Sequence, residues 1–220
     1  MNIWVIIPAY NESRSLEIVL KGLKDRNLSI LVVDDGSKDN TYKLAKKWAD
    51  VVIKSKRNFG KGVSIKKGIS YLKENKLFDC IITMDADGQH SLLDLDKFIK
   101  EAEAGVSVLV GNRMDNHSGM PLTRVVANNL MSWIISAIIR QKIPDTQCGF
   151  RLIKKEVLER ITIKTKKFEI ESEILIKAGR AGFTIKSIPI ESIYYKNIRS
   201  KINPFIDTIR FFNFIFKNHR

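Results

Sequence analysis

The sequence predicts an α/β protein with a mostly parallel, Rossmann-like sheet flanked by helices. Two observations carry this prediction. Short apolar runs alternate with segments whose apolar residues follow helical spacing, and most of these runs end in a cluster of polar residues. Such alternation gives right-handed βαβ units, and ligands bind such sheets beyond the carboxyl ends of the strands.

The elements of the first half are short and clearly bounded. Apolar runs predict strands at residues 3–7, 28–33, 51–53, 80–84 and 106–110. Helical spacing predicts the intervening helices at about residues 13–23, 40–48, 62–72 and 91–104. The first of these helices has an apolar face formed by Leu16, Val19, Leu20 and Leu23.

The second half of the chain is richer in helical patterns. Predicted helices cover residues 122–140, 154–161 and 169–179, with a polar loop at 145–151 and a strand at 183–190. Asn203 can cap a last helix that has Pro204 at its first position and runs to about residue 217. We therefore expect one domain over residues 1–201 and a C-terminal amphipathic helix over residues 202–220.

Polar side chains follow four of the predicted strands, at residues 8–12, 34–37, 85–89 and 111–113. Because the carboxyl ends of parallel strands meet at one edge of a sheet, we expect these clusters to face a single crevice. The convergence of four clusters is more specific than any one of the motifs.

Asp85 and Asp87 are the centre of this arrangement. They follow a buried apolar strand, and the period of two in an extended chain places them on the same face. Two carboxylates in this position suit a hard divalent cation that carries the phosphates of a substrate. A second Asp-x-Asp pair, Asp94 and Asp96, lies in an amphipathic helical pattern, so we expect those two side chains to be solvated.

The remaining motifs leave alternatives open. Residues 34–37 (Asp-Asp-Gly-Ser) either face a nucleotide or form a plain turn that caps a helix. Lys61 lies between two glycines that allow close approach to a phosphate, although such a turn often serves geometry alone. The chain has no dinucleotide fingerprint after its first strand and no Walker loop. His90 and His117 lack the spacing of zinc ligands, and we expect a local hydrogen bond for His90.

Composition narrows the partners and the compartment. The chain has 38 basic and 24 acidic residues, a net charge of +14, which favours an anionic partner or else a lysine-rich surface. Two distant cysteines favour reduced thiols in a cytosolic protein. We expect neither a signal peptide nor a stretch of the roughly 20 apolar residues that span a bilayer.

Five segments carry a resemblance to a known family. They are residues 7–12 (Ile-Pro-Ala-Tyr-Asn-Glu), 33–37 (Val-Asp-Asp-Gly-Ser), 58–62 (Asn-Phe-Gly-Lys-Gly), 84–90 (Met-Asp-Ala-Asp-Gly-Gln-His) and 145–151 (Asp-Thr-Gln-Cys-Gly-Phe-Arg). In this order they resemble glycosyltransferase family 2, which has the GT-A fold. Within that family the chain is most similar to the branch of dolichyl-phosphate mannose synthase and other polyprenyl-phosphate glycosyltransferases.

The resemblance implies a metal-dependent, inverting transfer of a hexose from a nucleotide sugar of the GDP-mannose or UDP-glucose type to a polyprenyl phosphate. It implies a Mg²⁺ or Mn²⁺ ion held by Asp85, Asp87 and Gln89. The residues implied for the nucleotide are Pro8, Tyr10, Glu12, Asp34, Lys61 and Ala86. Those implied for the acceptor phosphate are Arg113, Arg124, Arg199 and Lys201. The chain departs from the mannose synthases at Tyr195, where they carry an arginine, and Arg199 is the expected substitute.

The acceptor and the location have alternatives. If the acceptor is a hydroxyl of a glycan or small molecule, Asp145 is the candidate base; with a phosphate acceptor it is structural or positions the sugar. A third possibility is a basic nucleic-acid-binding module, but aromatic residues do not interleave with basic ones on any predicted strand, so we expect no nucleic acid.

The expected C-terminal amphipathic helix bears on where in the cell the protein is located. We expect a cytoplasmic protein that is peripheral on the cytosolic face of a membrane, through residues 202–220 or through a membrane partner protein. Phe211, Phe214 and Ile215 widen the apolar surface of this C-terminal helix and favour membrane or partner contact; the alternative is that the helix packs its phenylalanines on the domain. The helix at 122–140 either belongs to the core or flanks a prenyl chain.

Overall fold

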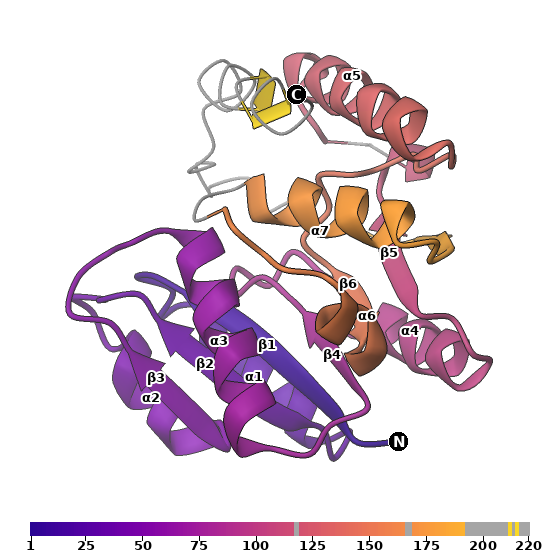
Figure 1. Ribbon diagram of the computed structural model, residues 1–220. Helices are drawn as coiled ribbons and strands as arrows, with labels where there is room; N and C mark the ends of the chain where they lie inside the picture. Colours follow the sequence, from indigo (N-terminus) through magenta and orange to yellow (C-terminus); the bar gives the residue numbers. More distant parts are fainter. Residues whose placement is uncertain (117–118, 166–168, 192–210, 213, 216–220) are drawn as a thin grey trace.

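A seven-stranded sheet runs through the protein in the order β3-β2-β1-β4-β6-β5-β7 (Figure 1). The computed structural model describes residues 1–116, 119–165, 169–191, 211–212 and 214–215. The strands are β1 (Ile3–Ala9), β2 (Ser29–Asp34), β3 (Val51–Lys54), β4 (Cys80–Thr83), β5 (Val108–Asn112), β6 (Arg151–Lys154) and β7 (Ile185–Pro189). Every strand predicted from the sequence is present.

Helices cover the sheet. They are α1 (Leu16–Lys24), α2 (Thr41–Trp48), α3 (Lys61–Asn75), α4 (Leu93–Glu103), α5 (Leu122–Ile139), α6 (Lys155–Arg160) and α7 (Glu169–Arg180), with a short 3₁₀ turn, η1 (Met114–Asn116). Strands β1 to β4 pair in parallel, so right-handed crossovers put α1 and α2 on one face and α3 on the other. Helix α5 packs against α7 beyond the end of the sheet that carries β5 and β7 (Figure 1).

Strand β6 was not predicted. It pairs antiparallel with both of its neighbours, β4 and β5, and Arg151 stands opposite Thr83 and Val110. Because its direction is reversed, β6 begins at the edge where β4 and β5 end. The loop at 145–150 that leads into β6 is therefore delivered to the same edge as the polar clusters. The strand has four residues with a basic residue at each end, which gives no periodic signal in the sequence.

The prediction for Asp94 was wrong. Its side chain is buried in the first turn of α4, where it accepts a hydrogen bond from the backbone N–H of Glu191 at 2.8 Å and pairs with Lys97 at 2.6 Å. The burial comes from the chain that leaves β7, which no local pattern reveals. Asp96, in the same turn, has a side chain that is 64% exposed, as expected.

The expectation that no stretch could span a bilayer also needs correction. Among the described residues, the 18-residue helix α5 is long and apolar enough, by length and composition only, to cross a bilayer; a core helix of a soluble protein can pass the same test. Only 28% of it is buried. One side, with Asn128, Met131 and Ile135, packs on the domain. The opposite side exposes four large apolar residues, the α5 apolar face: Leu122, Val126, Leu130 and Trp133.

Most of the predicted C-terminal helix lies outside the described residues, as do Arg199 and Lys201. Residues 211, 212, 214 and 215 are described and are helical. Phe211 and Phe214 are buried in the hydrophobic core. These two rings therefore pack on the domain and do not widen an exposed apolar surface.

Candidate active site

Asp34 is the last residue of β2 and lies beside the end of β1, at the edge of the sheet where the parallel strands end. Ala9 and Asp34 are register partners, and the Asp35 N–H donates to the Ala9 carbonyl at 2.8 Å. Asp34 is fully buried, and its Oδ1 accepts a hydrogen bond from the Ser37 N–H at 3.0 Å. Its Oδ2 is buried and has no hydrogen-bond donor among the residues that the structure describes. A buried acceptor of this kind is costly to leave unmatched, so it suits a donor group of a bound nucleotide.

The neighbouring Asp35 has a structural task. Its Oδ2 accepts hydrogen bonds from the backbone N–H groups of Phe59 at 2.9 Å and Gly60 at 2.7 Å. Gly36 has a φ of +78°, and a Cβ there would lie 2.7 Å from the backbone of Arg57. The two aspartates of the Asp-Asp-Gly-Ser segment therefore have different roles. Asp34 offers an unmatched oxygen to a ligand, and Asp35 anchors the loop that leads to Lys61.

Asp85 and Asp87 follow β4 directly and have strongly different surroundings. Burial acts to raise the pKa of Asp85, but the Lys61 ammonium, 2.6 Å away, outweighs it and lowers that pKa to about 2. Burial raises the pKa of Asp87 to about 6, and the negative charges of Asp85 and Glu12 add to the rise. Two carboxylates that repel one another in a partly buried site are the arrangement that a divalent cation relieves.

The residues present therefore fit a divalent cation. Gln89 lies in the same turn, with its backbone N–H donating to Asp87 Oδ1 at 3.0 Å. Within the described part of the chain, no group of three or more His, Cys, Asp or Glu side chains converges on one point. Two carboxylates and one amide would fill only part of the oxygen coordination shell of a divalent cation. Such an open shell is typical of a cation that also binds substrate phosphates.

Lys61 bridges two halves of the molecule. Its Nζ lies 2.6 Å from Asp85 Oδ1 and 2.9 Å from Glu171 Oε1, at the start of α7. Gly149 presses against this pair, because a Cβ there would lie 2.6 Å from Lys61 Nζ and 2.8 Å from Asp85 Oδ2. Sequence analysis missed Glu171 and Gly149 as site residues, since each reaches Asp85 only through the tertiary fold.

Arg113 and Asp145 form a bidentate ion pair at the end of β5. Arg113 Nε donates to Asp145 Oδ2 at 2.7 Å and Nη2 donates to Oδ1 at 2.9 Å. Asp145 is fully buried and also accepts from Asn128 Nδ2 on α5 at 2.9 Å and from the Gln147 N–H at 3.2 Å. Burial acts to raise the pKa of Asp145, but Arg113 outweighs it and holds that pKa below its usual range.

A second buried arginine, Arg151, organises the 145–150 loop. Its guanidinium donates to the carbonyls of Cys148 at 2.7 Å, Thr146 at 2.7 Å and Glu171. Thr83 Oγ at the end of β4 holds the Gly149 carbonyl at 2.8 Å. These bonds fix Gly149 and Glu171 around the Lys61–Asp85 pair.

His90 lies behind Asp85. Its Nδ1 accepts a hydrogen bond from the Asp85 N–H at 3.4 Å, and its ring stacks on Phe150 with centroids 5.2 Å apart. Burial lowers the pKa of His90 to about 4, so the ring is neutral near pH 7. The expected local hydrogen bond of His90 is confirmed, and both cysteines, Cys80 and Cys148, are free and buried.

The other predicted residues that the structure describes fall into two groups. Pro8, Tyr10, Glu12 and Ala86 lie at the ends of β1 and β4; Ala86 accepts a hydrogen bond from Ser15 Oγ at 2.8 Å, which ties these two ends together. Arg124 lies in the first turn of α5.

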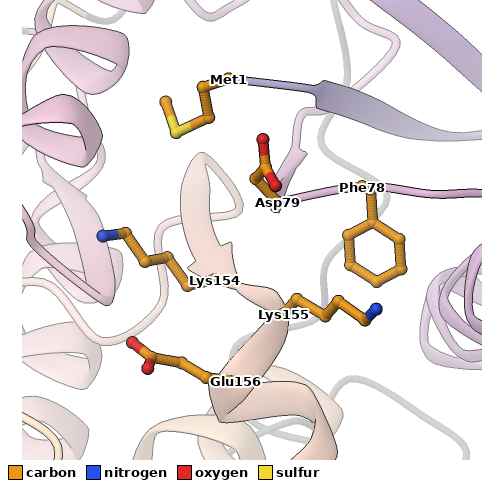
Figure 2. A pocket seen from close by; sticks show the side chains of 6 residues that line it. All are labelled: Met1, Phe78, Asp79, Lys154, Lys155 and Glu156. Carbon is orange, nitrogen blue, oxygen red and sulfur yellow. The ribbon is translucent and has the colours of Figure 1, made fainter.

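Figure 2 shows a pocket of about 340 Å³ at the other end of these strands, where β1 and β4 begin. Its lining is Met1, Phe78, Asp79, Lys154, Lys155 and Glu156. None of the residues predicted to bind donor, metal or acceptor lines it. The pocket is therefore separate from the candidate active site.

The sheet, its flanking helices and the carboxylates beyond β4 define a GT-A glycosyltransferase. The family model for glycosyl transferase family 2 matches residues 4–162, and the chain belongs to this family of enzymes. The predicted fold, family and enzyme class are thereby confirmed.

Relatives place the chain in the polyprenyl-phosphate branch. It is 33% identical over 216 residues to the UDP-N-acetylglucosamine–dolichyl-phosphate N-acetylglucosaminyltransferase of Methanococcus voltae, covering 87% of this chain and 86% of the relative. It is 28% identical over 237 residues to a dolichyl-phosphate beta-glucosyltransferase of Dictyostelium discoideum, covering 94% and 70%. Glucosyl-3-phosphoglycerate synthase from Mycobacterium tuberculosis, solved with Mn²⁺, UDP and phosphoglyceric acid, shares the fold with a TM-score of 0.68 and 19% identity over 88% of this chain and 71% of that one.

Proposed function

We propose that this enzyme transfers a hexose, or an N-acetylated hexose, from a nucleoside-diphosphate sugar to a polyprenyl phosphate, with a divalent cation and with inversion at the anomeric carbon. One observation carries the proposal. The carboxylates of Asp85 and Asp87 lie at the same sheet edge as Arg113, whose guanidinium is fixed by the buried Asp145. The carboxylates proposed to hold the metal and the arginine proposed to hold the acceptor phosphate thus share one edge of the sheet.

On the donor side, the protein supplies acceptors for the nucleotide and a cradle for its phosphates. The unmatched Asp34 Oδ2 would accept from the base or the ribose, next to Pro8, Tyr10 and Glu12 at the end of β1. Asp85, Asp87 and Gln89 would hold Mg²⁺ or Mn²⁺. The bound cation would neutralise the charge that develops on the departing nucleoside diphosphate, which contributes several kcal/mol to transition-state stabilisation.

On the acceptor side, Arg113 and Arg124 would bind the lipid phosphate, with Arg199 and Lys201 as further candidates. A phosphate oxygen is already ionised near neutral pH, so attack on the anomeric carbon needs no base. Asp145 is unsuited to that task because it is fully buried and surrounded by donors from Arg113, Asn128 and Gln147. Its role is to hold the Arg113 fork in the orientation that suits a phosphate.

The α5 apolar face supports a peripheral membrane location on the cytosolic side. Trp133 is 70% exposed and Leu122 78% exposed on a helix that also carries Arg124. Asn128, on the buried side of the same helix, donates to Asp145, so α5 lies next to the proposed acceptor site. A helix that buries such a face in a bilayer interface would present the lipid phosphate to Arg113 without spanning the membrane.

A donor-by-acceptor screen tests the proposal. The purified protein is mixed with GDP-mannose, UDP-glucose or UDP-N-acetylglucosamine and with polyprenyl phosphate in vesicles, and lipid-linked sugar is measured. We expect product with one donor, its loss in EDTA and its recovery with Mg²⁺ or Mn²⁺. Transfer that is unaffected by EDTA, or transfer only to hydroxyl acceptors, would contradict it.

The variant Asp145→Asn separates the two acceptor classes. With a phosphate acceptor, we expect the KM for the lipid to rise about tenfold, because Arg113 loses its charged partner, while the pH profile keeps its shape. Loss of a general base would instead lower kcat by about 10²–10⁴-fold and remove one limb of the pH profile. Circular dichroism of the variant checks that the fold is retained.

A further inference from the structure

The contact between Lys61, Asp85 and Glu171 has a consequence for the proposed cation. Asp85 is a ligand in the proposed function, yet its Oδ1 is engaged by the Lys61 ammonium at 2.6 Å. The side chains of Lys61, Asp85 and Glu171 are 22%, 29% and 10% exposed, so this is a shielded contact. The Lys61 ammonium and a divalent metal ion cannot occupy the same side of one carboxylate oxygen.

We propose that Lys61 is an internal counter-cation that occupies the metal position of Asp85 until the divalent cation displaces it, and that Glu171 is the positioning residue that keeps the displaced ammonium in the site. This inference rests on the metal dependence in the proposed function and names two residues that regulate it.

Three features support this exchange. Glu171 Oε1 already lies 2.9 Å from Lys61 Nζ, so the ammonium can leave Asp85 without losing every charged partner. Burial acts to lower the pKa of Lys61, but Asp85 and Glu171 outweigh it and raise that pKa, so Lys61 stays charged at any pH near neutrality. Gly149 has no side chain to obstruct the movement, whereas a Cβ there would lie 2.6 Å from Nζ.

The arrangement also explains why Glu171 is held so firmly. Its backbone carbonyl accepts a hydrogen bond from Arg151, which is itself fully buried. This bond fixes the backbone from which the Glu171 carboxylate reaches Lys61, whether or not Lys61 contacts Asp85. A competing internal cation lowers the affinity for free metal ions and leaves occupancy to the metal–nucleotide pair, whose phosphates give Lys61 a further anionic partner.

The test is a double-mutant cycle on Mn²⁺ binding without nucleotide, followed by the electron paramagnetic resonance signal of free Mn²⁺. We expect Lys61→Met to tighten Mn²⁺ binding about tenfold, since the competitor is gone. We expect Glu171→Gln to weaken it severalfold, because Lys61 then has only Asp85. In the double variant, Glu171→Gln should have almost no effect, whereas two independent charge effects would add.

Controls separate this proposal from the proposed function. Lys73→Met removes an exposed lysine from the same helix and should leave Mn²⁺ binding unchanged. Wild-type binding that Lys61→Met does not tighten, or additive effects in the cycle, would overturn the exchange and leave the metal site standing. Failure of both wild type and Lys61→Met to bind Mn²⁺ would overturn both. If Lys61→Met does not fold, Lys61→Gln replaces it, with the same expected sign.

Discussion

The two halves of the sheet build their shares of the site by different means. In the half from β1 to β4, the parallel strands end at the same edge of the sheet, and the polar residues that follow them lie at the site directly. Asp34 and Asp85 are examples. In the half that contains β5, β6 and β7, the functional groups are held by buried charged contacts. Arg113 depends on Asp145, and the 145–150 loop depends on Arg151.

This difference predicts how the site responds to a substitution in each half. On the donor side, the backbone topology does the positioning, so a substitution removes one function and leaves its neighbours in place. On the acceptor side, side chains position other side chains, so one substitution disturbs several residues at once. The predictions below test this contrast, from the largest effect to the smallest.

Asp85→Ala should have the largest effect, on activity alone. We expect transfer to fall by about 10³-fold or more, because the loss of metal neutralisation corresponds to several kcal/mol. The donor half should stay folded, because Lys61 keeps Glu171 as a partner and the loss of the Asp85–Lys61 ion pair is partly offset by the loss of repulsion with Asp87. Initial rates and urea denaturation measure the two quantities. Asp96→Ala, at the exposed member of the second Asp-x-Asp pair, is the matched control and should be active.

Arg151→Met should instead unfold the acceptor side. The variant leaves the buried carbonyls of Cys148, Thr146 and Glu171 without their donor. At about 1 kcal/mol for each, the free energy of unfolding should fall by about 3 kcal/mol. Urea denaturation of Arg160→Met, an exposed arginine at the end of α6, gives the comparison and should differ from wild type by less than about 0.5 kcal/mol. Equal stability of the two variants would remove the contrast between the halves.

The pH dependence of metal binding tests the crowding of Asp85 and Asp87. Burial and Asp85 raise the pKa of Asp87 to about 6, and a protonated carboxyl must release its proton to bind a cation. Mn²⁺ affinity should therefore fall about tenfold for each pH unit below about 6 and level off above it. Titrations at several pH values measure this slope, which Asp87→Asn should abolish.

The same pKa has an opposite effect on the stability of the metal-free protein. Folded Asp87 keeps a proton that the unfolded chain, with a pKa near 3.8, releases. Relative to the variant Asp87→Asn, the free energy of unfolding of the wild type should thus decrease as the pH rises from about 4 to about 6. The comparison with the variant is needed because buried His90, whose pKa is lowered to about 4, contributes a rise over the same interval in both proteins. A difference between the two proteins that rises in this interval would show that the pKa of Asp87 is not raised.

The smallest effect concerns the α5 apolar face. Val126→Asp should weaken cosedimentation with anionic phospholipid vesicles about fivefold, because it removes apolar contact and adds a repelled charge. Stability should change little, since Val126 is exposed. Leu77→Asp is the control: Leu77 is 82% exposed but precedes β4, at the opposite edge of the sheet. Equal loss of binding in both variants would exclude α5 as the membrane contact.

Much of the donor side could be predicted from the sequence because it depends on local order. An apolar run followed by Asp-x-Asp places two carboxylates beyond a strand wherever that strand lies in a parallel sheet. The acceptor side could not be predicted to the same extent. Strand β6 has no periodic pattern, and Asp94 looked solvated although the chain after β7 covers it.

The chain order by itself determined the parallel α/β fold, the family motifs and the common edge at which Asp34, Asp85 and Arg113 lie. Only the tertiary structure decided that β6 runs antiparallel, that Asp145 holds Arg113 and that Lys61 lies between Asp85 and Glu171. The reason is the separation of the interacting residues along the sequence. The end of a strand is determined by neighbouring residues, whereas a buried ion pair joins residues dozens of positions apart and is fixed by packing.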